Sequence, residues 1–191
     1  MATLRIFIAL EFSPEVIAEI GRCQELLKRE VDLPVAWTDP KGIHLTLRFL
    51  GETNEERIAG IAKRLGSIAA ETAPFTLSLG HFGVFPSPTR PRVLWIGLDG
   101  DLPTLGFLQN RVEEEMDVLG FGTEDRPFAP HLTLGRIRPQ QRRGPPVPVS
   151  ASAVGEVRPV AQQVRGMSLI RSQLTPRGAV YTRLAEFAFR G

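Results

Sequence analysis

The stretches IHLTLRFLG (residues 43–51) and PHLTLGRIR (residues 130–138) share the tetrapeptide His-Leu-Thr-Leu. The two copies contain His44 and His131, two of the three histidines of the chain. Both stretches are predicted to be β-strands, in which successive side chains point to opposite faces. Each histidine then shares a face with the threonine two positions later. The sequence therefore predicts two matching strands whose leucines anchor a core and whose polar pairs face a cleft.

The segments around the two copies match as well. The two histidines are 87 positions apart, and the words FIAL (residues 7–10) and WIGL (residues 95–98) are 88 apart. In both halves a strand, an acidic residue, a helix led by proline and the motif strand follow in that order. We infer an internal duplication in one bilobal domain over residues 1–191, with approximate repeat units starting near 5 and 92. The expected class is α+β, with two pseudo-symmetric lobes of mainly antiparallel sheet, outer helices and an active-site cleft between the lobes.

Hydrophobic periodicity and turn residues predict the remaining elements. Strands are expected over residues 4–12, 43–51, 75–85, 92–98, 128–138, 167–174 and 180–189, and helices over 14–30, 53–68 and 101–121. Ser13 is the expected N-cap of the first helix, with Pro14 as its first residue. Thr53 and Glu56 have the spacing of a capping box for the second helix. The last two strands are expected to form a hairpin around residues 175–178.

The composition is that of an ordinary globular protein of 191 residues, 42% hydrophobic, with a formal net charge of +2. Cys23 is the only cysteine, which excludes an intrachain disulfide and favours a reducing, cytoplasmic location. We find no signal peptide and no membrane-length apolar segment, and a monomer is the default expectation. Of 23 basic residues 20 are arginine, which reflects either genomic base composition or a preference for phosphate ligands.

Two imidazoles and two hydroxyls in one cleft suit displacement at phosphorus. An imidazole titrates near neutrality, so one ring can take a proton from water while the other gives one to the leaving group. Threonine hydroxyls and arginines can bind the non-bridging oxygens. Arg48 and Arg136 are the nearest arginines to the two histidines in sequence. By strand alternation Arg48 shares the face of His44, whereas Arg136 reaches the cleft only if the strand bends near Gly135.

The chain resembles the two-histidine phosphoesterase superfamily, in its RNA 2′,3′-cyclic phosphodiesterase (2′-5′ RNA ligase-like) branch. The segments that carry the resemblance are RIFIAL, HLTLRFLG, RVLWIGL and FAPHLTLGRIR. The resemblance implies hydrolysis of RNA 2′,3′-cyclic phosphate ends to 2′-phosphates without a metal or other cofactor. It also implies 2′-5′ ligation as a side activity. His44 is expected to be the proton donor and His131 the proton acceptor, although pseudo-symmetry allows the reverse. Thr46, Thr133 and Arg136 are expected to bind the phosphate. Arg48 is a further candidate phosphate ligand, from its expected place on the face of His44.

Several alternatives remain open at this level. The chain could instead hydrolyse a small cyclic nucleotide or nucleotide-sugar phosphate, or bind RNA without catalysis. Arg142 and Arg143 either contact the RNA or belong to an exposed connector. A tRNA fragment is one candidate substrate. His81 is expected in a strand or in the cleft wall. Neither motif contains an acidic residue, so no metal site is expected.

Overall fold

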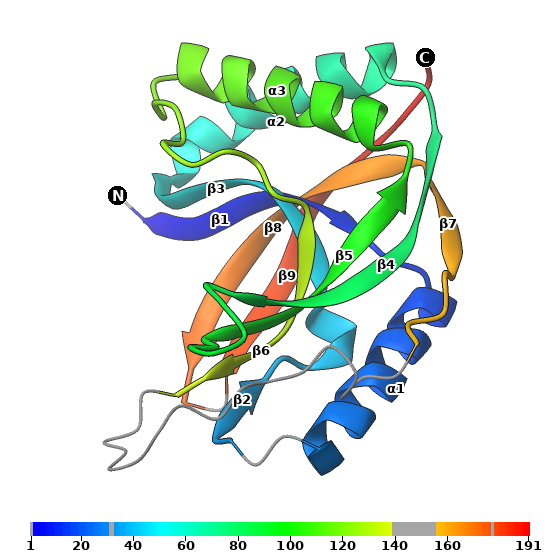
Figure 1. Ribbon diagram of the computed structural model, residues 1–191. Coiled ribbons are helices and arrows are strands. Elements are labelled where there is room, and N and C mark those ends of the chain that lie inside the picture. Colours follow the sequence, from blue (N-terminus) through cyan, green and yellow to red (C-terminus); the bar gives the residue numbers. More distant parts are fainter. Residues whose placement is uncertain (1, 31–32, 139–155, 177) are drawn as a thin grey trace.

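The computed structural model describes residues 2–30, 33–138, 156–176 and 178–191 (Figure 1). Its strands are β1 (Thr3–Glu11), β2 (Val35–Trp37), β3 (His44–Asn54), β4 (Phe75–Phe85), β5 (Val93–Gly100), β6 (His131–Ile137), β7 (Ala161–Val164), β8 (Gly166–Thr175) and β9 (Gly178–Ala188). Its helices are α1 (Pro14–Glu30), α2 (Ile58–Glu71) and α3 (Leu102–Val118), and the short 3-10 turns are η1 (Pro40–Gly42) and η2 (Glu55–Arg57). Every predicted strand and helix is present, whereas the short strands β2 and β7 were not predicted.

The strands form two antiparallel sheets, which confirms the predicted α+β class. Sheet A has the order β3-β1-β8-β9, and sheet B has the order β2-β6-β5-β4-β7. Each sheet mixes the two halves of the chain, because β8 pairs with β1 and β4 pairs with β5. The motif strands β3 and β6 occupy matching places beside β1 and β5. The duplication itself remains an inference from these parallels.

Helices cover the outer faces of the sheets. Figure 1 shows α2 and α3 side by side at the top of the molecule and α1 at the lower right. Helix α1 lies against sheet B, where the buried Gln24 donates its Nε2–H to the main-chain oxygens of Thr38 and Leu134. Helices α2 and α3 lie against sheet A, through β8, β9 and β3. Among the described residues, no helix has the length and apolar character needed to span a membrane.

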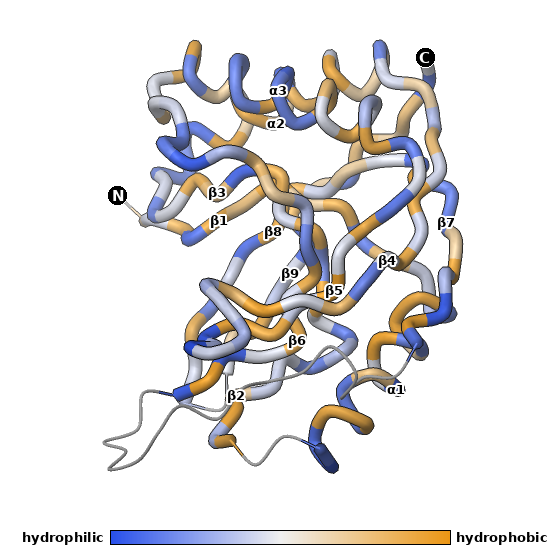
Figure 2. Tube along the Cα trace, in the orientation of Figure 1, coloured by the Kyte–Doolittle hydropathy of each residue, from blue (hydrophilic) through white to orange (hydrophobic). Residues whose placement is uncertain are grey.

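The apolar stripes of these helices and the inward faces of the strands form one continuous core. In β3 and β6 the leucines of both motif copies are buried in it, as the alternation predicts. Figure 2 shows apolar segments concentrated in the strands and on the inner sides of the helices. Burial of these leucines fixes which face each motif strand turns toward the cleft, since a one-residue slip would expose them.

The predicted helix starts are right at the first helix and wrong at the second. Helix α1 begins at Pro14, and Ser13 Oγ accepts a 3.4 Å hydrogen bond from Val16 N–H, which confirms Ser13 as the N-cap. The predicted capping box at Thr53 is wrong. Thr53 is buried inside β3 and its hydroxyl donates to Gly51 O, because β3 runs on to Asn54 before η2 and α2 begin.

Both motif strands carry a β-bulge at the same position. In β3, Thr46 pairs with Ala9 and Arg48 with Ile8, so Leu47 is the extra residue. In β6, Thr133 pairs with Trp95 and Gly135 with Leu94, so Leu134 is the extra residue. A bulge exchanges the faces of the residues that follow it, in β6 up to the end of the strand and in β3 up to a second register shift at Leu50. Beyond the motif, simple alternation therefore fails in both strands.

The same register corrects the sequence alignment of β1 with β5. Ile8 and Leu94 hold the equivalent places opposite the two bulges, which is an offset of 94 − 8 = 86 positions. The alignment of FIAL with WIGL is therefore two residues out of step. The error preserves the side-chain faces, because strands repeat every two residues.

Candidate active site

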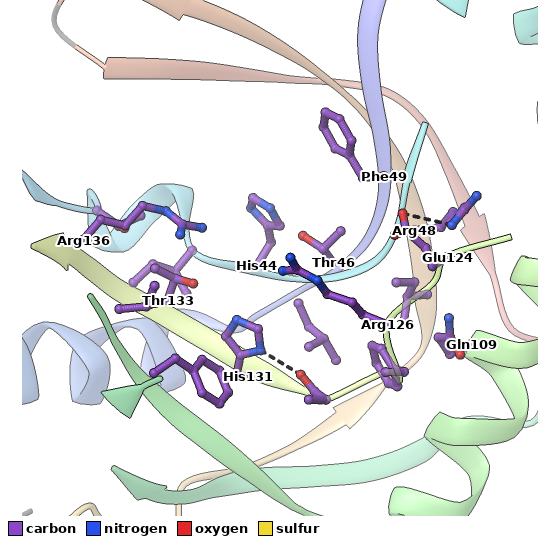
Figure 3. Close-up of a pocket in the computed structure, with 18 of the residues that line it drawn as sticks. His44, Thr46, Arg48, Phe49, Gln109, Glu124, Arg126, His131, Thr133 and Arg136 are labelled. Carbon is purple, nitrogen blue, oxygen red and sulfur yellow. Dashed lines mark hydrogen bonds and ion pairs between the residues drawn. The ribbon is translucent and has the colours of Figure 1, made fainter. Parts of the chain in front are cut away.

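The polar faces of the two motif strands meet across one cleft of about 780 Å³ between the sheets (Figure 3). Its walls include His44 and Thr46 from β3 and His131 and Thr133 from β6. This size is within the range of small-molecule and cofactor sites. The four motif side chains predicted to share a cleft do so.

The two histidines are held in the same tautomer by the same kind of contact. His44 Nδ1–H donates to Gly42 O at 2.8 Å, and His131 Nδ1–H donates to Ala129 O at 2.7 Å. A carbonyl oxygen can only accept, so Nδ1 carries the proton in each ring. Each Nε2 is left to exchange a proton with a bound substrate. The backbone two residues before each histidine therefore prepares both rings for proton transfer.

Aromatic rings fix the orientation of each imidazole. His44 stacks on Phe7 with ring centroids 4.5 Å apart and meets the edge of Tyr181 at 5.0 Å. His131 is in edge contact with Phe85 at 5.2 Å and Trp95 at 6.3 Å. These contacts restrict ring rotation, and the main-chain acceptors then determine the direction of Nε2.

Burial lowers the pKa of His44 below its ordinary value of 6.5. The hydrogen bond to Gly42 O and the negative charge of Glu11 act in the opposite direction but more weakly. Glu11 lies opposite His44 on β1, where its carboxylate accepts hydrogen bonds from Arg183 and Ser168. Once protonated, His44 is therefore a stronger acid than a solvated histidine.

Arg136 reaches the cleft because of the bulge at Leu134. The extra residue turns Arg136 to the face of Thr133, which supplies the bend that the sequence analysis required near Gly135. Gly135 is also needed for close packing, because a Cβ there would lie 2.6 Å from Val35 Cγ1. Arg136 is exposed in the cleft, and no described residue forms an ion pair with it.

Arg48 does not lie on the face of His44, so the alternation argument is wrong at this position. The bulge at Leu47 turns Arg48 inward, where it is only 4% exposed. Its Nη1 lies 3.0 Å from Glu113 Oε1 and 2.9 Å from Glu124 Oε1. Its Nη2 donates to Gly122 O at 2.8 Å. Arg48 borders the cleft, but its charge is already balanced by protein carboxylates.

Arg126 is a cleft residue that the sequence analysis missed. It lies between α3 and β6, and its side chain extends into the cleft toward the strand of His44 and Thr46 (Figure 3). It is exposed and, within the part of the chain that the structure describes, has no ion-pair partner. The available signal in the sequence was an arginine five residues before His131. Strand alternation could not place its side chain, because Arg126 precedes β6.

The other candidate residues are less informative. His81 lies on β4 with its ring 5.4 Å from that of Trp95, and it is not part of the cleft wall. Arg142 and Arg143 lie outside the described residues. Among the described residues, no group of three or more His, Cys, Asp or Glu side chains is placed to hold a metal ion. Burial raises the pKa of the Cys23 thiol to about 11, which makes this cysteine a poor nucleophile.

Comparison with known proteins identifies the family. The model of the LigT-like phosphoesterase family matches residues 10–95 and 97–181. The chain belongs to this family. The two matches start 87 positions apart, the same offset as that between the two histidines. This match confirms the two-histidine phosphoesterase superfamily that the sequence motifs indicated.

Curated members of the family resemble the chain over almost its whole length. A protein of Methanothermobacter thermautotrophicus named RNA 2′,3′-cyclic phosphodiesterase is 32% identical, over 96% of this chain and 98% of its own. One of the same name from Archaeoglobus fulgidus is 34% identical, over 96% of this chain and 99% of its own.

Solved structures of the family share the fold. The protein TT0787 of Thermus thermophilus superposes with a TM-score of 0.80 and 30% identity, covering 98% of this chain and 99% of that one. Escherichia coli LigT complexed with 3′-AMP superposes with a TM-score of 0.77 and 25% identity, covering 99% of both chains.

Proposed function

We propose that this protein is an RNA 2′,3′-cyclic phosphodiesterase that hydrolyses the cyclic end to a 2′-phosphate. The observation that carries the proposal is the pair of imidazoles with identical tautomers, each with Nε2 available on the wall of one cleft. The names of the family members quoted above support the substrate class. A non-catalytic RNA-binding role would leave the matched tautomers without a purpose.

The proposed reaction divides proton transfer between the two rings. His131 Nε2 takes a proton from water as the water oxygen forms a bond to phosphorus. The bond from phosphorus to the 3′ oxygen breaks, and protonated His44 Nε2 gives its proton to that oxygen. The products are a 2′-phosphate and a 3′-hydroxyl. The bound anionic phosphate favours the charged form of His44, which offsets the effect of burial on its pKa.

Phosphate binding is assigned to Thr46, Thr133 and Arg136. The hydroxyls lie one on each wall of the cleft, and the exposed guanidinium of Arg136 adds a positive charge beside Thr133. Charge-assisted hydrogen bonds to the non-bridging oxygens strengthen as negative charge develops on the phosphate. The mechanism uses no metal or other cofactor.

The natural substrate is proposed to be an RNA with a cyclic phosphate end, such as a tRNA fragment, in the cytoplasm, with the enzyme acting as a monomer. Arg142 and Arg143 are proposed to bind phosphates upstream of the reacting end, on the sequence argument alone. In the same cleft, the 5′-hydroxyl of a second RNA can replace water as the nucleophile. Its attack on phosphorus with departure of the 3′ oxygen would give 2′-5′ ligation as a side activity.

The test compares turnover of three substrates with a metal chelator present throughout: a short RNA with a 2′,3′-cyclic phosphate, a cyclic mononucleotide and a cyclic nucleotide-sugar phosphate. We expect the highest kcat/KM on the RNA, and loss of turnover after His44→Ala or His131→Ala. His81→Ala, outside the cleft, is the matched control and retains activity. Preference for either small substrate contradicts the RNA assignment, and loss of activity with chelator contradicts the metal-free mechanism.

A further inference from the structure

The two half-sites differ in the side chain that each motif strand turns to the cleft just after its bulge. Arg136 is the second residue after the bulge at Leu134, and Phe49 is the second residue after the bulge at Leu47. Both line the cleft, so the half-site of His131 has an arginine where the half-site of His44 has a phenylalanine. One face of the Phe49 ring is covered by Arg5, whose guanidinium carbon lies 4.6 Å from the ring centroid. The strand of His44 therefore supplies no free cation of its own to the cleft.

Arg126 supplies a cation to this side from another part of the chain. Figure 3 shows Arg126 and Arg136 entering the cleft from opposite sides, Arg126 from the connection between α3 and β6 and Arg136 from β6 itself. Both are exposed and without ion-pair partners among the described residues. A phosphodiester has two non-bridging oxygens, and two cations on opposite sides can each bind one of them.

The segment that carries Arg126 is fastened to β3 by Arg48. This buried guanidinium contacts Phe121 O, Gly122 O and the carboxylate of Glu124. It also pairs with Glu113 on α3, whose Oε1 accepts a 2.6 Å hydrogen bond from Glu124 N–H. The network ends two residues before Arg126. Two main-chain oxygens and the half-exposed carboxylate of Glu124 thus tie the segment to the buried guanidinium, and the Glu124 N–H ties it to α3.

We propose that Arg126 binds a non-bridging oxygen of the reacting phosphate beside Thr46, and that Arg48 is the positioning residue that holds Arg126 there. This inference rests on the proposed function and adds a second phosphate-binding arginine to it. Thr133 with Arg136 then serves one oxygen, and Thr46 with Arg126 serves the other. The charge that accumulates on both oxygens in the transition state is stabilised from both sides.

The first test measures kcat/KM for the Arg126→Ala and Arg126→Lys variants on adenosine 2′,3′-cyclic phosphate and on a short RNA with the same end. We expect Arg126→Ala to lower kcat/KM on the order of 10²-fold on both substrates. The lysine variant should keep part of the activity, because it keeps the charge but loses the two-pronged geometry. Arg64→Ala, which removes an exposed pair with Glu115, is the control and should match wild type. A loss confined to the RNA substrate, or no loss, contradicts the inference.

The second test examines Arg48 by a double-mutant cycle. Arg48→Lys keeps the charge but cannot make all the contacts of the guanidinium, so kcat/KM should fall at least about 5-fold when Arg126 is present. In the Arg126→Ala background the same change should cause no further fall, measured well below the Tm of each variant. Equal losses in both backgrounds would show a general structural effect and contradict the positioning role.

A binding measurement separates this inference from the proposed function. Calorimetric titration with adenosine 2′-monophosphate should show binding weakened about 10-fold or more by Arg126→Ala, as for loss of one charge-assisted hydrogen bond. If that holds while wild type fails to hydrolyse any cyclic phosphate, only the proposed reaction is wrong. If wild type hydrolyses the RNA end and Arg126→Ala changes neither binding nor turnover, only the inference about Arg126 is wrong.

Discussion

Gly135 follows the bulge of β6 and lets β2 pack closely against it. Replacing Gly135 with alanine tests whether this close packing holds Arg136 in place. The added Cβ would lie 2.6 Å from Val35 Cγ1 and 3.2 Å from Ala36 O. Val35 is β-branched and cannot swing aside freely, so β2 must move away. Over-packing of this kind costs about 1–3 kcal/mol. The movement also shifts Arg136, the next residue, so kcat/KM should fall roughly 10-fold or more.

Urea unfolding of a double-mutant cycle with Val35→Ala measures the effect. Removing the Val35 methyl groups should recover most of the free energy of unfolding lost through Gly135→Ala. Gly60→Ala is the matched control, because Gly60 lies in α2 with no atom within 4 Å of the added Cβ. It should stabilise the protein by about 0.5–1 kcal/mol. A Gly135→Ala variant as stable as wild type, or an effect that is the same with and without Val35→Ala, would show that Gly135 is not packed against Val35.

Three further predictions concern the buried arginine and the two histidines. In a urea titration, Arg48→Met should lower the free energy of unfolding by about 3 kcal/mol. This is near the lower end of the cost of breaking a buried ion pair, because Glu124 is half exposed. As the control, Arg64→Met should change the free energy of unfolding by less than about 1 kcal/mol. By NMR, the His44 ring protons should titrate with a midpoint below pH 6.5. Because the unfolded chain then binds more protons than the folded one, the free energy of unfolding should fall as the pH drops from about 6.5 through the folded pKa, and level off below it. A midpoint above 6.5 would contradict the effect of burial on His44. With a substrate whose 3′ bridging oxygen is sulfur, a leaving group that needs no proton, His44→Ala should regain activity and His131→Ala should not; the opposite pattern reverses the assignment of acid and base.

The sequence was sufficient for the parts of the fold that depend on local periodicity. The strand β1, the Pro14 helix start and the two motif strands follow from apolar spacing and capping residues, and the structure confirms them. The three residues of β2 and the polar AQQV segment of β7 are too short to show a period. They are ordered by pairing with β6 and β4, which is a tertiary effect.

The candidate site was predictable up to the bulges and not beyond them. His44 and Thr133 lie before the extra residues, so alternation places them correctly. Arg48 lies after one, and its true environment depends on carboxylates contributed by α3 and by the segment that follows α3. Arg126 belongs to no strand, so no periodic argument applies to it. These positions depend on register and on long-range contacts, which the sequence of a single chain does not display.

The most direct test of the two-histidine mechanism is the identity of the product formed in ¹⁸O-labelled water. An RNA ending in a 2′,3′-cyclic phosphate is incubated with the enzyme and a metal chelator, and the product is analysed by ³¹P NMR and mass spectrometry. We expect a 2′-phosphate that carries one ¹⁸O atom, formed by wild type and by neither His44→Ala nor His131→Ala. A 3′-phosphate, or a 2′-phosphate that still forms when both histidines are replaced, would contradict this mechanism.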